Sequence, residues 1–356
     1  MHFLSLLENP PYGYGLNIQE VIALASDYAV CLGKRTPDKP LSPRWFYKFM
    51  ARNPLLKTGK PQSLDVYRAR ASSKDNVVKY FDNLKKCMDD AGVTDKPHLI
   101  YNVDEKGLTA QYTPHKIVCS KWTNCTEITP PRRSLTTLIG CGNALGNAFS
   151  PYFVFAGSKL RDNVLANATP GTAATTSKSG WSNSDVFRTF LKDHFVKYAK
   201  PTAAEPVLLI YDGHKSHVNI GIADWAIENN IRLFVLPAHT SHFLQPLDVA
   251  CFGPLESLFT SSKHRLMKHH KNGLLSNDEI CTLACKAYQD GLNQRNLVAG
   301  FRKTGIYPMI GIEAIPEATF APSIPFAPPH EEAPPREEEA TEENDATARP
   351  TEVNTM

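Results

Sequence analysis

The sequence predicts an α/β protein in which a mixed sheet with flanking helices follows a small all-helical domain. From residue 98 onward, apolar runs of strand length and amphipathic segments of helical length follow one another in the order β-β-β-α-β-α-β-α. The residues before 98 show helical periodicity only. Beyond residue 310 the chain becomes proline-rich and acidic, so it lacks the apolar side chains that a core requires.

The overall composition is that of an ordinary globular protein, with 42% apolar and 21% charged residues in a chain of 356. This length provides enough apolar material for a sizeable core and two folded units. The net charge of +3 conceals an asymmetry, because nine acids and only two arginines lie in residues 331–356. A basic body with an acidic tail indicates a polyanionic partner, although a mild lysine surplus also occurs on ordinary solvated surfaces.

Cellular compartment is constrained by apolar runs and by cysteines. No apolar run approaches the length of a membrane span, and the stretch Phe3–Leu7 is too short for a signal-peptide core. The eight cysteines include no Cys-x-x-Cys pair, so reduced thiols in a cytosolic or nuclear protein are expected. We therefore expect no membrane partner and no secretory route.

Two amphipathic helices are predicted near the amino terminus. Residues 18–32 place their apolar side chains on one helical face, and Gly33 ends the segment. Ser42 and Pro43 begin a second helix, which is aromatic on its inner face and ends before Pro54. A short connection between two such helices is what a helix-turn-helix module needs.

The outer face of the second helix is basic. Residues 34–70 contain ten Lys or Arg against two Asp, and the helix places three of the basic residues at intervals of four. Such a face can enter the major groove of double-stranded DNA, although a basic helix that only keeps the protein soluble fits the same periodicity. The expected DNA-binding residues are Arg44, Lys48, Arg52, Lys57 and Lys60.

The remaining elements are predicted from periodicity and turn signals. A third helix spans residues 74–91, and residues 169–184 read as a Thr-, Ser- and Gly-rich loop. Strands are expected at 98–103, 135–142, 151–155, 207–211 and 231–236, and helices at 185–198, 217–229 and 248–267.

Three aspartates follow or open these elements. Asp104 follows the first strand, Asp212 follows the fourth strand, and Asp248 opens the last helix. If the first and fourth strands lie side by side in parallel, their carboxyl ends meet at one edge, where α/β sheets place their sites. Simpler explanations exist, since Asp212 can stabilise a turn and Asp248 can cap a helix.

Four histidines surround two of these acids. His214 and His217 follow Asp212, while His239 and His242 precede Asp248, each pair with the spacing His-x-x-His. Zinc binding is one explanation, but zinc sites combine such pairs in a closed tetrahedral set. We favour histidines that hold the loops around the acids or contact phosphate.

Three motifs give the sequence a family resemblance. The stretches NVDEKGL from Asn102, YDGHKSH from Tyr211 and LPAHTSHFLQPLDVA from Leu236 resemble those of the pogo, Tigger and jerky group of DDE transposases. The first and third depart from the usual pattern at Lys106 and in the Ala-His-Thr-Ser-His segment, but no acid is lost. The resemblance covers residues 42–310 and implies an RNase H-like fold.

The resemblance also implies the site and its cofactor. Asp104, Asp212 and Asp248 match the catalytic, metal-binding triad of the family, with Mg²⁺ as cofactor and Mn²⁺ as an alternative. Hard divalent cations prefer oxygen ligands, and a pair of them can activate the attacking oxygen and stabilise the leaving one. Glu105 would point away from this triad if the strand continues.

The stretch before the sheet resembles a centromere protein B-type DNA-binding domain. Its first helix-turn-helix is expected to be absent, because the chain begins too late to contain it. The domains expected from the resemblance are a DNA-binding domain at 1–71, a linker helix at 72–97, a catalytic domain at 98–310 and a disordered acidic tail at 311–356.

The resemblance implies a transposon-derived nuclear protein that binds double-stranded DNA and retains a DDE endonuclease and strand-transfer core. One alternative is a domesticated nuclear DNA-binding protein without catalysis, and another is an incomplete gene model of a mobile element. The sequence leaves room for a homo-oligomer and specifies no DNA target.

Overall fold

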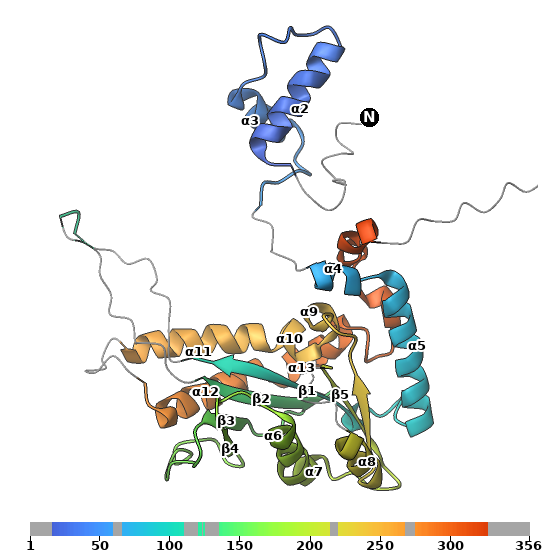
Figure 1. Ribbon diagram of the computed structural model, residues 1–356, viewed down its shortest axis with the longest axis vertical. Helices are drawn as coiled ribbons and strands as arrows, with labels where there is room; N and C mark the ends of the chain where they lie inside the picture. Colours follow the sequence, from blue (N-terminus) through green and yellow to red (C-terminus); the bar gives the residue numbers. More distant parts are fainter. Residues whose placement is uncertain are drawn as a thin grey trace, which may run out of the picture.

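The computed structural model describes residues 16–59, 66–109, 120–122, 124, 135–213, 220–267 and 275–326. Helices α2 (Ile18–Cys31) and α3 (Pro43–Arg52) pack against each other near the amino end of this range. They stand apart from the sheet that forms the body of the molecule (Figure 1). Phe46 and Phe49 are the buried residues of α3, so its aromatic face points inward as predicted.

A six-stranded mixed sheet forms the body. Its order is β4-β3-β2-β1-β5-β6, with β1 antiparallel to β2 and parallel to β5. This arrangement confirms the predicted mixed sheet with flanking helices. The strands are β1 (Ile100–Leu108), β2 (Thr136–Asn143), β3 (Tyr152–Ala156), β4 (Ala173–Ser177), β5 (Val207–Tyr211) and β6 (Ile231–Val235).

Helices cover both faces of the sheet (Figure 1). Alternate residues of a strand point to opposite faces, and the core divides accordingly. Ile139 and Val154 join the cluster on the side of α5, α6 and α8, whereas Leu138 and Phe153 join the cluster on the side of α11 and α12. The helices are α5 (Lys74–Ala91), α6 (Ser184–Thr189), α7 (Val196–Ala199), α8 (Ile220–Glu228), α11 (Phe252–Met267), α12 (Asn277–Gly291) and α13 (Gln294–Lys303).

Several elements differ from the prediction. The loop expected at 169–184 contains edge strand β4, which pairs in parallel with β3. The helix expected at 185–198 consists of α6 and α7 joined by a π-helical stretch, Phe190–Phe195. The last expected helix is divided at Cys251 into α10 (Pro246–Ala250) and α11, while α9 (Ser241–Leu244) precedes them.

The expectation of disorder from residue 311 is wrong for its first part. Three 3₁₀ turns, η4 (Gly311–Ala314), η5 (Glu317–Thr319) and η6 (Ala321–Phe326), continue the fold. Ile315 and Phe320 are both 5% exposed and belong to the main core. Two apolar side chains among prolines are enough to dock the segment because a preformed core receives them. Residues 327–356 lie outside the described residues.

Candidate active site

The first two aspartates lie at the same level on neighbouring strands. β1 and β5 run in parallel, and the last pair in their register is Asn102 with Ile210. Asp104 and Asp212 each lie two residues beyond that pair. The condition that the first and fourth strands lie side by side in parallel is therefore met, and it brings both acids to one edge of the sheet.

The third aspartate comes from a short helix that packs against β1. Asp248 lies in the first turn of α10, after Pro246. The helix begins after Gln245, which makes no side-chain capping bond. The explanation of Asp248 as an N-cap is therefore wrong, and its carboxylate instead joins the pocket described below.

A buried amide network joins the three elements that carry the acids. Asn102 Nδ2 donates to the carbonyl of Ile210 at 2.9 Å and to Oε1 of Gln245 at 2.8 Å. Asn102 Oδ1 accepts from the backbone N–H of Leu247 at 3.1 Å. Gln245 Nε2 donates to the carbonyl of Val103 at 3.1 Å. The network fixes β1, β5 and α10 to one another within three residues of each aspartate.

A pocket of about 750 Å³ opens at this edge of the sheet. Asp212 and Asp248 lie in its wall together with Arg68 of helix α4 (Val66–Ala71). The other lining residues are Gly213, Pro237, Ala238, His239, Ser241 and His242. The pocket therefore combines two of the three predicted acids with an arginine.

The three carboxylates influence one another electrostatically. Burial raises the pKa of Asp104 well above its usual value, and the charges of Asp248 and Asp212 raise it further. A hydrogen bond from the backbone N–H of Glu105 acts in the opposite direction and lowers it. Partial desolvation raises the pKa of Asp248, and the charge of Asp212 raises it further, while the charges of Lys106 and Arg68 lower it. Such mutual repulsion is the condition that a bound cation relieves.

The acids fit a divalent metal by their chemistry. Asp104 Oδ2 is buried and has no hydrogen-bond partner in the part of the chain that the structure describes, so one hard oxygen donor is left for a ligand. Among these residues no three His, Cys, Asp or Glu side chains stand close enough to hold an ion as they are placed. An ion would therefore have to draw the carboxylates together.

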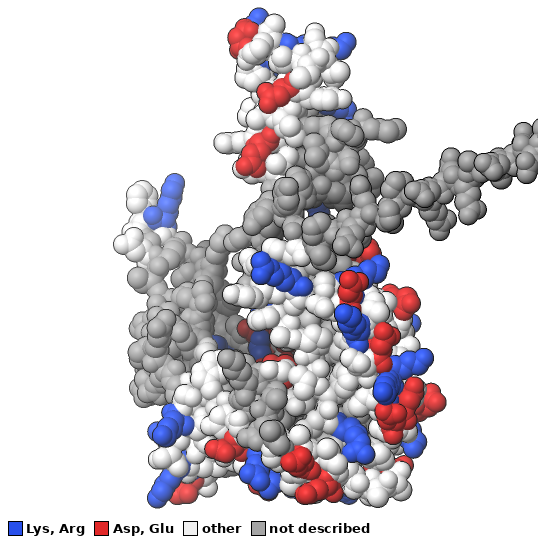
Figure 2. Space-filling model, turned by 45° about the vertical axis from the view of Figure 1, so that its right-hand side comes forward, with Lys and Arg blue, Asp and Glu red and all other residues white. Residues whose placement is uncertain are grey.

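The predicted DNA-binding residues lie apart from this pocket. Arg44, Lys48 and Arg52 are exposed on the outer face of α3, as predicted, and Lys57 is exposed in the segment after it. Lys60 lies outside the described residues. On the face shown in Figure 2, acidic and basic side chains are interspersed over the body. The candidate DNA-binding surface is therefore the outer face of α3.

Of the four histidines near the predicted acids, one pair lies at the pocket. His239 and His242 line the pocket, and His239 adopts a left-handed backbone conformation with φ of 66°, which is uncommon outside glycine and marks constrained loops. His214 and His217 lie outside the described residues.

Sequence reasoning missed Asn102, Gln245 and Arg68. A signal existed for the first two, because each is a polar residue inside an apolar motif that precedes an acid. Arg68 has no such signal, since its short helix meets the pocket only through tertiary structure.

Comparison with known proteins gives one family and one curated relative. Residues 132–298 match the DDE superfamily endonuclease family. A protein of Cochliobolus lunatus named MFS-type transporter clz9 is 34% identical over 184 residues, which are 51% of this chain and 20% of that protein. The chain thus spans about a fifth of the length of that relative. In the described residues, no helix is both long and apolar enough to cross a membrane.

Solved structures of Mos1 transposase are similar in outline. The mariner paired-end complex with Mn has a TM-score of 0.44 and 14% identity, over 83% of this chain and 77% of that one. The paired-end complex with the left transposon end has a TM-score of 0.41 and 14% identity, over 80% and 78%.

Proposed function

We propose that this protein, which carries a DDE superfamily endonuclease domain over residues 132–298, is a transposable-element-derived DNA-binding protein that cuts and rejoins DNA phosphodiesters with divalent metal. The observation that supports the proposal most strongly is that Asp104 and Asp212 lie at one edge of the sheet on paired strands, while Asp212 and Asp248 line one pocket. Three carboxylates that repel one another cost stability, so a purely structural role does not explain them.

Asp104, Asp212 and Asp248 would hold the metal, with Mg²⁺ expected and Mn²⁺ as an alternative. When bound, a pair of such ions supplies activation of the attacking oxygen and stabilisation of the leaving oxygen. The amides of Asn102 and Gln245 keep the strands and α10 that bear the acids in fixed relation. The pocket wall then orients the phosphodiester beside them.

Double-stranded DNA is the proposed substrate, and the nucleus is the proposed location. The exposed face of α3 supports DNA binding, because Arg44, Lys48 and Arg52 present three cations on one helix side. We propose that α2 and α3 act as a helix-turn-helix reader. Cleavage at paired DNA ends would require a homo-oligomer.

Nicking of supercoiled plasmid in Mg²⁺ or Mn²⁺ tests the catalytic proposal, with Asp212→Asn as the control. We expect the wild-type protein to convert supercoiled plasmid into the open circle and the variant to bind DNA without nicking it. If neither protein nicks DNA and both bind it, the catalytic proposal is wrong. The exposed α3 face would then support the alternative, a domesticated DNA-binding protein without catalysis.

A further inference from the structure

We propose that Arg68 is a phosphate-binding residue of the active-site pocket, contributed by the helix that follows the α2 and α3 pair in the chain. The inference rests on the proposed function, since the phosphate is that of the DNA strand held beside the three acids. It adds a residue from outside the matched endonuclease domain, and it connects the amino-terminal part of the chain to the reacting group.

The charge of the pocket motivates the proposal. Two carboxylates in the wall repel a phosphodiester as well as each other. Among the described residues that line the pocket, Arg68 is the one Lys or Arg. A guanidinium presents paired donors that match phosphate oxygens, and it stays charged at any physiological pH.

The donors of Arg68 are not committed elsewhere in the described part of the chain. The ion pairs within 4.0 Å among the described residues join Lys74 to Glu317 and Lys106 to Glu256. None of them includes Arg68, whose charge acts on Asp248 from a longer distance and lowers the pKa of that acid. An exposed arginine held at an acidic pocket without a close carboxylate is better suited to a ligand than to a structural ion pair.

Packing fixes the side of α4 on which Arg68 lies. Ala69 and Ser72 are buried, and Ser72 Oγ donates to the carbonyl of Arg68 at 2.8 Å. Arg70 points elsewhere, with its guanidinium 5.0 Å from the ring centroid of Phe326. Residues two apart on a helix of 3.6 residues per turn lie about 200° apart around its axis, so only Arg68 faces the pocket.

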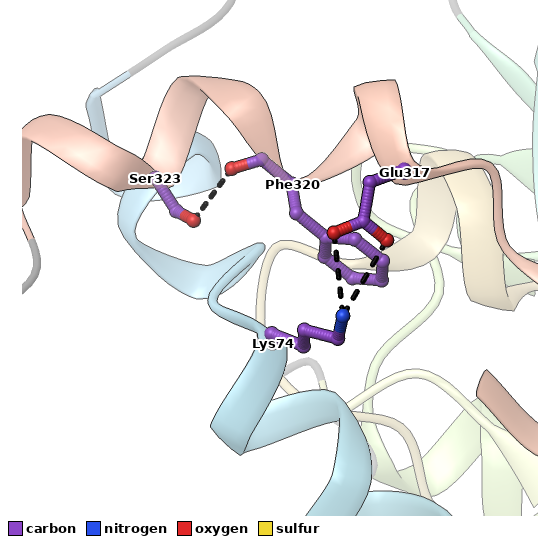
Figure 3. A network of polar contacts seen from close by, with 4 residues as sticks. All are labelled: Lys74, Glu317, Phe320 and Ser323. Atoms are coloured by element: carbon purple, nitrogen blue, oxygen red, sulfur yellow. Dashed lines mark hydrogen bonds and ion pairs between the residues drawn. The ribbon is translucent and has the colours of Figure 1, made fainter.

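One of the 3₁₀ turns that follow α13 in the chain packs against α4. Helix α4 packs on η6, and Lys74, at the start of α5, pairs with Glu317 of η5 at 3.2 Å (Figure 3). Phe320 is buried in the main core, and its carbonyl accepts a 2.7 Å hydrogen bond from Ser323 Oγ. The segment that sequence analysis assigned to a disordered tail therefore supports the helix that presents Arg68.

A residue of the pocket wall also contacts α4. Tyr67 stacks on the ring of His239, with 5.8 Å between centroids and an interplanar angle of 26°. His239 lines the pocket and has the constrained left-handed backbone. The residue before Arg68 thus rests on the pocket wall, which limits how far the guanidinium can move from the acids.

Arginine footprinting tests this assignment without requiring catalysis. The full-length chain is treated with phenylglyoxal in EDTA, with and without linearised plasmid DNA, and modification is quantified by mass spectrometry at Arg68, Arg70, Arg44 and Arg52. All four side chains belong to exposed residues. We expect DNA to slow modification at Arg68 several-fold and to leave Arg70 unchanged.

The outcomes separate this inference from the proposed function. Protection of Arg44 and Arg52 without protection of Arg68 would overturn the phosphate-binding role while DNA binding stands. Protection of none of them would remove DNA binding itself. Protection of Arg68 by DNA in a protein that fails to nick plasmid would support the inference and contradict only the catalytic proposal.

Nicking kinetics give a second test where the protein is active. Loss of a preorganised donor to the reacting group lowers kcat by about 10²–10³-fold, and this is the effect expected of Arg68→Ala. Arg68→Lys should recover part of the loss, because the charge is kept and the paired donors are not. Arg70→Met, which keeps the apolar contact with Phe326, is the matched control and should retain activity. Equal losses in the Arg68→Ala and Arg70→Met variants would mean that α4 is only structural.

Discussion

The side-chain amide of Asn102 donates a 2.8 Å hydrogen bond to Oε1 of Gln245, and both residues are completely buried. Asn102 lies two residues before Asp104, and Gln245 lies three residues before Asp248. Buried amides are stable only when their donors and acceptors are paired. The pairing here joins the backbones next to all three acids, so the geometry of the site is set beneath the carboxylates.

Asn102→Leu should therefore damage both stability and the site. The substitution leaves the carbonyl of Ile210 and the N–H of Leu247 unpaired in the core, at a cost of about 1–3 kcal/mol for each group. We expect the free energy of unfolding, measured by urea denaturation, to fall by about 3 kcal/mol. The Mn²⁺ concentration that gives half-maximal nicking should also rise.

Asn143→Leu is the matched control for that prediction. Asn143 is also buried, and it bonds the carbonyl of His98 at 3.2 Å and the N–H of Asn147 at 2.9 Å, next to the start of β1 rather than its acidic end. We expect a loss of stability without a change in the Mn²⁺ requirement. The same change of Mn²⁺ requirement in both variants would show that the Asn102 network has no particular role in positioning the acids.

The sequence was sufficient to predict the parts of the site that depend on local pattern. Val207–Tyr211 is a run of apolar residues bounded by Pro206 and Gly213, and it forms β5 with the predicted limits. An acid at the end of such a strand lies at a sheet edge whatever the surrounding fold. The sequence left the parallel pairing of β1 with β5 as a condition for the acids to meet, and the register of the two strands fulfils that condition.

The parts that could not be predicted depend on contacts between distant segments. Strand β4 consists of Ala, Thr and Ser residues and is only half-buried, so it forms because the edge of β3 offers backbone partners. Arg68 reaches the pocket because α4 is held between η6 and His239. Ile315 and Phe320 dock on a core that no local pattern around them describes.

Asp104→Asn should change stability and activity in opposite directions. Burial and the neighbouring acids raise the pKa of Asp104 in the folded protein, so ionisation costs folded-state stability, and the cost grows as pH rises through the unfolded value of 3.8. The neutral amide removes this cost. In EDTA at neutral pH we expect stabilisation of about 1 kcal/mol, seen as a melting temperature higher by about 2–4 °C, together with loss of nicking.

Glu105→Gln is the control for the effect of charge removal. Glu105 is the next residue of β1 and is also partly buried, but alternate strand residues point to opposite faces. We expect unchanged nicking and a smaller change of melting temperature. If Asp104→Asn lowers the melting temperature instead, mutual repulsion is not the dominant effect at this acid.

DNA binding through α3 should depend steeply on salt. Each phosphate contact contributes about −0.9 to the slope of log affinity against log salt concentration. Replacing Arg44, Lys48 and Arg52 together by alanine should therefore make the slope shallower by about 2–3. Fluorescence anisotropy with labelled duplex DNA across a salt series measures this slope.

The double variant Lys85→Ala and Lys86→Ala, on exposed positions of α5, is the control and should keep the wild-type slope. A slope that does not depend on the α3 residues would place DNA binding elsewhere.

Stability should fall in mild acid because of His194. This histidine is 2% exposed, its Nε2 lies 2.7 Å from the carbonyl of Ser150, and aromatic rings including Phe190 and Tyr198 surround it. Burial lowers the pKa of His194 below 6.5. The unfolded chain therefore takes up a proton first as pH falls, and stability present above about pH 6.5 is lost toward the folded pKa, by at most about 1.4 kcal/mol per pH unit.

Urea denaturation between pH 7 and pH 5 measures this loss. His194→Gln, which can still donate to the Ser150 carbonyl but does not titrate in this range, should show a weaker dependence on pH. His98→Gln, at an exposed histidine, should behave as the wild-type protein does. An unchanged pH dependence in His194→Gln would assign the acid sensitivity to other groups.

Gly300 sets the distance between α13 and the helix that carries Asp248. A Cβ at residue 300 would lie 2.6 Å from the carbonyl oxygen of Pro246, the first residue of α10. Because that oxygen belongs to the backbone, Gly300→Ala must push α10 away and displace Asp248. We expect a loss of at least about 1 kcal/mol of stability and reduced nicking.

Gly253→Ala is the matched control, because it places the same methyl group in open space in the first turn of α11. Alanine should there be neutral or stabilising by up to about 1 kcal/mol. Retained stability and nicking in Gly300→Ala would show that α10 can shift without cost and that close packing against α13 does not position Asp248.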